Sequence, residues 1–174
     1  MLYNAKNGTL KIGDTTMDYI RFGSGERILV MLPGLGDGLR SMKGTELPMA
    51  LMYRMFAKDY KVYLFDRRND IGESITVREL ASDIAVAMDA LHIKNADIFG
   101  VSQGGMIAQY LAIDRPDLVR KMVLAVTLSR NNDTARAVIS KWIQLTEQDK
   151  IKELVADMAA KMYSDAYVKR YQPF

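Results

Sequence analysis

The sequence contains no cysteine and a single histidine, His92, among its 174 residues. The absence of cysteine excludes disulfide bonds, a thiolate nucleophile and any metal site built on sulfur ligands. One histidine and scattered carboxylates are too few ligands for a metal site, so we expect no metal and no other cofactor. A single histidine also restricts any acid–base chemistry that depends on imidazole.

Long apolar runs are missing as well. No segment approaches the length of a membrane span, and the N-terminus has no apolar stretch of the kind found in secretory signals, so we expect a cytoplasmic protein. The charge is nearly balanced, with 24 Lys and Arg against 21 Asp and Glu. Because the basic residues are scattered rather than clustered, the sequence gives no indication of nucleic-acid binding.

What the sequence does contain is an alternation of short apolar runs and helical patterns. Residues 9–12 and 15–22 predict a hairpin around Gly13-Asp14. Four later apolar runs are typical of strands that are buried on both faces, and they lie at residues 28–32, 60–65, 96–101 and 121–127. Helical patterns separate them, the second opened by a capping box at Thr76–Glu79. This order predicts an α/β fold: a mostly parallel sheet with an N-terminal hairpin and helices on both faces.

Beyond Thr127 the pattern changes to two amphipathic helical stripes with no strand between them. Their apolar residues recur at helical spacing over 135–143 and 151–162. We therefore expect a core over residues 1–128 and a helical lid segment over 129–174 that is incomplete. Periodicity alone favours equally the alternative that these helices cover the flank of the sheet.

The most informative segment is Gly100-Val101-Ser102-Gln103-Gly104, which lies between a predicted strand and a predicted helix. A Gly-x-Ser-x-Gly in this position is typical of a nucleophile elbow. The turn is so tight that its neighbours must be small, as Gly100 and Gly104 are. The serine would lie at the helix N-terminus, whose unpaired N–H groups and partial positive charge favour a developing oxyanion.

A glycine-rich loop, Pro33-Gly34-Leu35-Gly36-Asp37-Gly38, directly follows the first buried strand. Ligands bind at this end of the strands in open α/β sheets. Dinucleotide binding is one alternative for these glycines. Their spacing is not Gly-x-Gly-x-x-Gly, however, and no helical pattern begins directly after them, so we disfavour it.

On these motifs the chain resembles the α/β-hydrolase family over nearly its whole length. Four stretches carry the resemblance in the family's order, namely Ile28–Gly38, Phe65–Ser74, Ala90–Gly105 and Arg115–Leu124. The resemblance implies that Ser102 attacks an ester or related acyl group and forms an acyl-enzyme. It implies that the backbone N–H groups of Leu35 and Gln103 form the oxyanion hole. Pro33-Gly34 stands where the family usually has His-Gly, a change that retains the backbone donor.

The rest of a catalytic triad is missing from the sequence. In this fold the acid and the histidine follow the serine along the chain, whereas His92 precedes it and is predicted at the opposite edge of the sheet. Asp133 is a candidate acid, although a residue that opens the next helix is the more typical interpretation. We do not expect His92 to act as the base, because a base must come within about 3 Å of the hydroxyl.

Three hypotheses remain for the activity of this chain. We favour the first, in which it is the N-terminal part of a longer serine hydrolase and is nearly inactive alone. The others are a non-catalytic relative that binds a small ligand and an enzyme with an unusual base; acyl transfer would use the same residues as hydrolysis. The expected partner is a small acyl substrate with an apolar part, and an open sheet edge would favour self-association.

Overall fold

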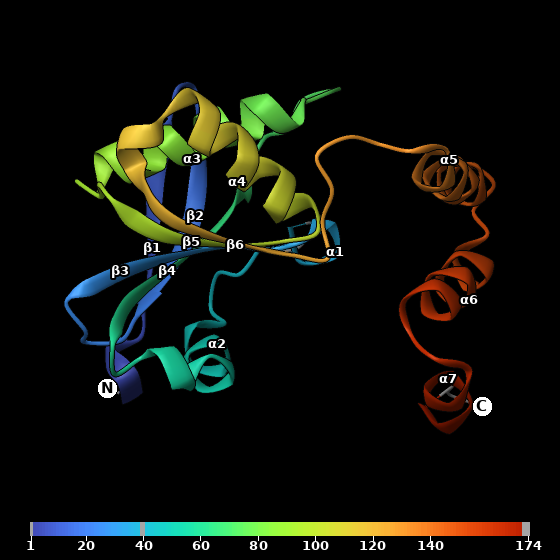
Figure 1. Ribbon diagram of the computed structural model, residues 1–174, viewed down its shortest axis with the longest axis horizontal. Helices are drawn as coiled ribbons and strands as arrows, with labels where there is room; N and C mark the ends of the chain where they lie inside the picture. The colour runs from blue at the N-terminus through green and yellow to red at the C-terminus, as the bar shows by residue number, and fades with distance from the viewer. Residues whose placement is uncertain (1, 39–40, 172–174) are drawn as a thin grey trace. The chain divides into compact units, whose positions relative to one another are not determined.

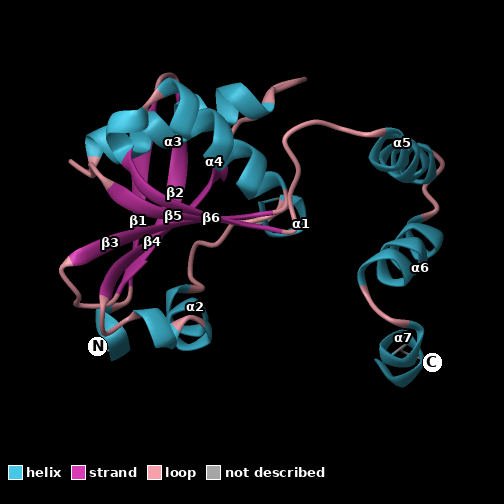
Figure 2. Cartoon of the chain, viewed as in Figure 1, coloured by secondary structure: helices cyan, strands magenta, loops and turns pink. Residues whose placement is uncertain are grey.

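The computed structural model describes residues 2–38 and 41–171. The chain forms two compact units, Met1–Ser129 and Arg130–Phe174. The first contains the sheet and the second contains only helices (Figure 2). That the second unit acts as a lid stays a prediction.

The first unit is built on a six-stranded sheet with the strand order β1-β2-β4-β3-β5-β6. β1 and β2 form an antiparallel hairpin, and β2 pairs antiparallel with β4. β4, β3, β5 and β6 are parallel to one another. The predicted mostly parallel sheet with an N-terminal hairpin is therefore confirmed. The strands are β1 (Lys6–Ile12), β2 (Thr15–Phe22), β3 (Arg27–Leu32), β4 (Tyr60–Arg68), β5 (Ala96–Val101) and β6 (Val119–Ala125).

Helices cover both faces of this sheet, as predicted. α3 (Val77–Ala90) and α4 (Gln103–Asp114) lie on one face and α2 (Glu46–Met52) lies on the other (Figure 1). Each face has its own apolar core: the α3–α4 core includes Phe65, Met88 and Ile107, and the α2 core includes Phe22 and Leu64. The shorter segments are α1 (Leu35–Gly38) and the 3-10 turns η1 (Leu2–Asn4), η2 (Arg54–Phe56) and η3 (Pro116–Leu118).

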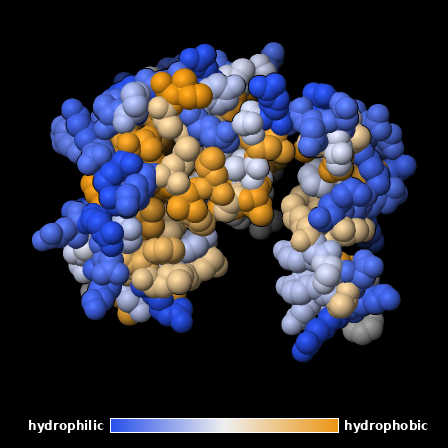
Figure 3. Space-filling view, in the orientation of Figure 1, coloured by the Kyte–Doolittle hydropathy of each residue, from blue (hydrophilic) through white to orange (hydrophobic). Residues whose placement is uncertain are grey.

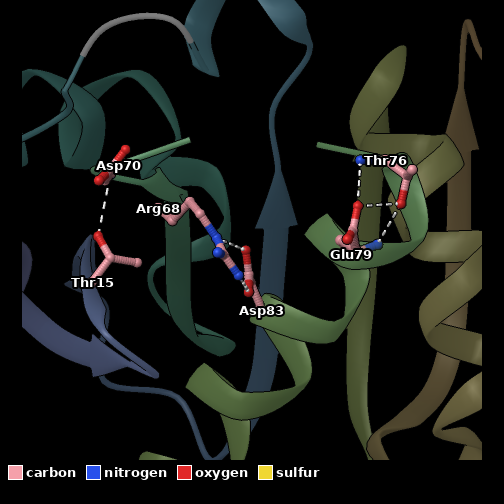
Figure 4. A network of polar contacts seen from close by, with 6 residues as sticks. All are labelled: Thr15, Arg68, Asp70, Thr76, Glu79 and Asp83. Atoms are coloured by element: carbon pink, nitrogen blue, oxygen red, sulfur yellow. Dashed lines mark hydrogen bonds and ion pairs between the residues drawn. The ribbon is translucent and has the colours of Figure 1, made fainter. Parts of the chain in front are cut away.

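Polar contacts fix α3 against the ends of the strands (Figure 4). Thr76 caps the helix: its hydroxyl accepts from the Glu79 N–H at 3.2 Å, and its own N–H donates to Glu79 Oε2 at 2.7 Å, which confirms the capping box. The Thr76 N–H and the Thr76 hydroxyl both bond to the Glu79 carboxylate and lower its pKa. One turn further on, the almost fully buried carboxylate of Asp83 pairs with Arg68, whose Nε donates to Oδ2 at 2.7 Å. The helix is therefore anchored to the end of β4.

Four strands differ from their predicted limits, and β1 and β3 differ only by an earlier start, at Lys6 and Arg27. β4 continues three residues beyond the apolar run, to Arg68, because its polar end still pairs with β2 opposite Met17. β6 begins and ends two residues early, at Val119 and Ala125. Val126 has a φ of 45°, which turns the chain out of the sheet. The prediction that this run is buried on both faces is also wrong, because β6 is an edge strand and none of its residues is buried.

The second unit consists of α5 (Asp133–Glu147), α6 (Ile151–Met162) and α7 (Asp165–Tyr171). α5 and α6 are the two predicted amphipathic helices, joined by the Trp142 indole, which donates to Asp157 Oδ2 at 2.8 Å. α7 was not predicted. Among the residues described in this unit only Leu145 is buried, and the apolar stripes of both helices are half-buried or exposed. Across residues 2–38 and 41–171, no helix combines the length and the apolar character needed to cross a membrane.

Removing the Thr76 hydroxyl tests the cap at the start of α3. Thr76→Ala deletes the hydroxyl that accepts from Glu79 N–H, and loss of such a cap lowers the free energy of unfolding by about 1 kcal/mol. Ser82→Ala, an exposed change in the interior of the same helix, is the control and leaves stability unchanged or slightly higher. Chemical denaturation followed by circular dichroism measures both. Equal stability of the two variants would contradict the capping role.

Candidate functional site

Ser102 lies at the turn between β5 and α4 in a strained backbone conformation. Its φ of 52° and ψ of −120° are unusual for a residue with a side chain. Hydrogen bonds from several directions hold it there. Its N–H donates to the Ala125 carbonyl at 2.9 Å, and its own carbonyl accepts from the Thr127 hydroxyl at 2.6 Å and from Gly105 N–H at 3.0 Å. The end of β6 and the first turn of α4 thus impose the conformation of the candidate nucleophile.

The glycines of the elbow are required by close packing. A Cβ on Gly100 would lie 2.6 Å from the Gly104 carbonyl oxygen, and a Cβ on Gly104 would lie 2.0 Å from the Leu32 carbonyl oxygen. A Cβ on Gly105 would lie 2.6 Å from the side chain of Thr127. No side chain fits at these three positions unless the backbone moves, so α4 starts in direct contact with the end of β3.

The loop after β3 lies beside the serine. A Cβ on Gly34 would be 3.4 Å from Ser102 Cβ and 3.9 Å from its Oγ. The next residue, Leu35, is the first of α1, as Gln103 is the first of α4. The N–H groups at the start of a helix have no acceptor within that helix. The two predicted oxyanion donors therefore belong to segments that flank Ser102, and neither N–H group donates a hydrogen bond within its own helix.

Two buried charged residues, Asp66 and Arg67, lie near the end of β4, and Arg67 contacts the segments beside Ser102. Asp66 accepts from the N–H groups of Met42 and Arg67, each at 2.9 Å. Burial raises the pKa of the Asp66 carboxyl, against the effect of those two bonds. The Arg67 guanidinium donates from Nη2 to the Pro33 carbonyl at 2.9 Å and to Gln103 Oε1 at 3.1 Å. Burial lowers the pKa of Arg67, while the charge of Asp66 raises it.

No sequence pattern indicated a role for Arg67, although it lies within one of the stretches that carry the family resemblance. Its neighbour Arg68 is also an arginine, and periodicity cannot show which of the two turns toward the elbow. The structure shows that Arg68 pairs with Asp83 on α3, while Arg67 contacts Gln103.

His92 does not approach Ser102. It is exposed, in the turn that follows α3 and precedes β5. Ser102 follows the other end of β5, so the six residues of that strand separate them by roughly 20 Å at 3.3 Å per residue. Asp133 is the first residue of α5 and pairs with Arg136 at 2.6 Å; Asn132 rather than Asp133 caps that helix. Within the described part of the chain, no group of three or more histidine or acidic side chains could hold a metal ion.

The sequence also matches a known family. Residues 27–168 match the family model described as the alpha/beta hydrolase fold. The chain belongs to this family. The matched residues include β5, β6 and the loop after β3, in agreement with the resemblance seen in the motifs.

Curated relatives of the chain carry the names of several enzymes. A putative non-heme bromoperoxidase, BpoC, from Mycobacterium tuberculosis is 32% identical over 123 residues, which cover 68% of this chain and 44% of that protein. The 3-oxoadipate enol-lactonase 2 of Acinetobacter baylyi is 25% identical over 171 residues, covering 92% and 59% respectively. The chain thus spans about half the length of the curated relatives it matches.

Solved structures show the same fold. An alpha/beta hydrolase enzyme, MGS-M2, from a deep-sea metagenome library has a TM-score of 0.82 at 18% identity, over 95% of this chain and 60% of that one. A hydrolase from Pseudomonas aeruginosa has a TM-score of 0.75 at 22% identity, over 98% and 63% respectively. The α/β-hydrolase assignment leaves the dinucleotide alternative for Gly34–Gly38 without support.

The close packing of Gly104 is testable by substitution. Gly104→Ala places a methyl group against the Leu32 and Pro33 carbonyls, and such overpacking lowers the free energy of unfolding by about 3 kcal/mol. Gly36→Ala is the matched control, because a Cβ there meets nothing within 4 Å, and its effect stays within about 0.5 kcal/mol. Thermal and chemical denaturation of both variants measure the difference. A Gly104→Ala protein as stable as Gly36→Ala would show that the elbow is not close-packed.

Proposed function

We propose that this protein is a hydrolase that uses Ser102 as its nucleophile. The observation that carries the proposal is the strained Ser102 backbone, fixed between the start of α4 and the loop after β3. In this mechanism Oγ attacks the acyl carbon, and the N–H groups of Leu35 and Gln103 bind the oxyanion. Collapse of the tetrahedral intermediate releases the alcohol and leaves an acyl-enzyme, which water then cleaves.

The proposed substrate is a small ester or related acyl compound with an apolar part. The names of the relatives support this class, since they include 3-oxoadipate enol-lactonase and pyrrolizixenacetamide deacetylase. Exposed apolar side chains on α5 and α6, among them Ile143 and Val155, would suit an apolar substrate if these helices act as a lid. Transfer of the acyl group to an acceptor other than water would use the same residues.

We further propose that the acid and the histidine of the triad lie outside these 174 residues. The position of His92 supports this, and so does the shorter length of the chain relative to its relatives. Without a base, the serine hydroxyl is a weak nucleophile, and only binding and the oxyanion hole contribute to catalysis. A cytoplasmic location also stays a prediction.

Covalent labelling tests the nucleophile. We expect a fluorophosphonate probe to modify Ser102 slowly, as measured by intact-mass and peptide mass spectrometry. Ser102→Ala abolishes the label. Ser74→Ala, the control, leaves the label unchanged because it replaces another exposed serine of the same unit. The labelling rate rises steadily with pH, without an inflection at pH 6–7, because no imidazole acts on Ser102. Modification elsewhere in the chain, or none at all, would favour a protein that only binds its ligand.

Turnover tests the absence of a base. We expect the rate at which the 174-residue chain hydrolyses p-nitrophenyl butyrate to exceed the rate of Ser102→Ala by less than about tenfold. The reason is that removal of triad members leaves only residual catalysis. Release of p-nitrophenol at 400 nm measures both proteins. Robust turnover that depends on Ser102 would overturn this part of the proposal and require an unusual base.

We also propose self-association through the edge of the sheet. β6 pairs only with β5 among the described strands. It carries Val123 and Leu124, which are 57% and 41% exposed, and Val126 follows at 85%. Figure 3 shows hydrophobic side chains gathered on the part of the first unit where β6 lies in Figure 1. Unpaired edges with exposed apolar area favour association.

Sedimentation velocity tests this association. We expect dimers or larger species whose share rises with protein concentration, and Val123→Lys reduces that share because a charge on an edge strand opposes pairing. The control is Val86→Lys, which changes an exposed valine on α3 and leaves the association unchanged. A stable monomer at every concentration would contradict the proposal.

A further inference from the structure

Arg67 joins the two segments that carry the proposed oxyanion donors. Its Nη2 donates both to the carbonyl of Pro33, two residues before Leu35, and to the side chain of Gln103. One guanidinium nitrogen therefore links the loop after β3 to the first residue of α4. Relative movement of the two segments would break at least one of these bonds.

Stability alone does not account for an arginine at this position. Arg67 is 6% exposed, and its Nη1 is buried with no hydrogen-bond partner among the described residues. Among the side chains that the structure describes, no carboxylate forms an ion pair with the guanidinium; the neighbouring Asp66 accepts from the backbone N–H groups of Arg67 and Met42 instead. Burying a cation without an ion pair is costly. The adjacent Arg68, in contrast, forms a direct ion pair with Asp83.

The guanidinium also contributes charge to the site. Arginine stays protonated in proteins even where burial lowers its pKa. Its positive charge lies beside Gln103, at the N-terminal end of α4, where the helix itself has a partial positive charge. The guanidinium is buried, and electrostatic interactions are stronger in a buried environment than in water. Negative charge that develops next to Ser102 would be stabilised by both charges.

We propose that Arg67 is the positioning residue of the oxyanion hole: it fixes the spacing between the Leu35 and Gln103 N–H groups and adds positive charge behind them. The inference rests on the proposed role of Ser102. It assigns Arg67 no contact with the substrate. Its effect is exerted on the step in which the oxyanion forms, rather than on the binding that precedes it.

The test is the kinetics of Ser102 phosphonylation by a fluorophosphonate in the full chain at pH 8.5. The dependence of the rate on probe concentration separates binding (KI) from the covalent step (kinact). Arg67→Met is expected to lower kinact by about 10- to 100-fold, somewhat less than the loss of a whole oxyanion donor, with KI changed less than twofold. Arg67→Lys keeps the charge and one donor nitrogen and recovers part of kinact.

Two further variants keep the result decisive. Arg68→Lys is the matched control, because Arg68 touches neither Pro33 nor Gln103, and it retains the wild-type kinact. If circular dichroism shows that Arg67→Met does not fold, Gln103→Met removes the other end of the contact from a partly exposed position and is expected to lower kinact about threefold to tenfold.

The outcomes separate this inference from the proposed function. Wild-type kinact in the folded Arg67 and Gln103 variants, with labelling still abolished by Ser102→Ala, would overturn the role of Arg67 and leave Ser102 as the nucleophile. Absence of Ser102 labelling in the wild-type chain would overturn both.

Discussion

The contact between Gly104 and the end of β3 is the constraint on which the site depends. It brings the start of α4 against the Leu32 and Pro33 carbonyls, at a distance that excludes even a Cβ. Because α4 starts there, Ser102 has to complete the turn from β5 within one residue, and it does so at a positive φ. Gly34 also lies so close to the serine that a Cβ at this position would be in van der Waals contact with Ser102 Cβ. The elbow and the loop after β3 therefore lie side by side.

The polar contacts around the elbow hold this arrangement from the other sides. Ala125 and Thr127, at the end of β6, bind the backbone of Ser102, and Val126 between them turns the chain out of the sheet. Arg67 reaches the elbow from β4 through Gln103. Three parallel strands besides β5 therefore meet at this point: β3 by packing, and β4 and β6 by hydrogen bonds. Such convergence at the carboxyl ends of strands is the general site of ligand binding in α/β sheets.

Much of the fold could be predicted from the sequence, because buried parallel strands give continuous apolar runs and the capping box at Thr76 gives a sharp helix start. The limits of β4 and β6 could not. The end of β4 is polar, since Asp66 and Arg67 are buried for their contacts rather than for their apolar surface. The end of β6 depends on the backbone angle of Val126 and not on its hydropathy. α7 is too short to give a clear helical period.

The site was predictable only where backbone constraints require particular residue types. Gly100 and Gly104 indicate the elbow because nothing larger fits, and the order of the segments predicts that the loop after β3 lies beside Ser102, as the short distance from a Cβ on Gly34 to the serine shows. The contacts of Arg67 could not be predicted, because the sequence does not show which of two adjacent arginines turns toward the elbow and which pairs with α3. The separation of His92 from the site could be predicted. His92 precedes β5 and Ser102 follows it, so the two residues lie at opposite ends of that strand.

The most direct measurement of the central claim is the crystal structure of the chain after phosphonylation. The account predicts phosphorus bonded to Ser102 Oγ, with a phosphoryl oxygen about 2.7–3.1 Å from the N–H groups of both Leu35 and Gln103, and with the contacts of Arg67 to Pro33 and Gln103 retained. A phosphoryl group on another residue, or one on Ser102 whose oxygens point away from both N–H groups, would contradict it.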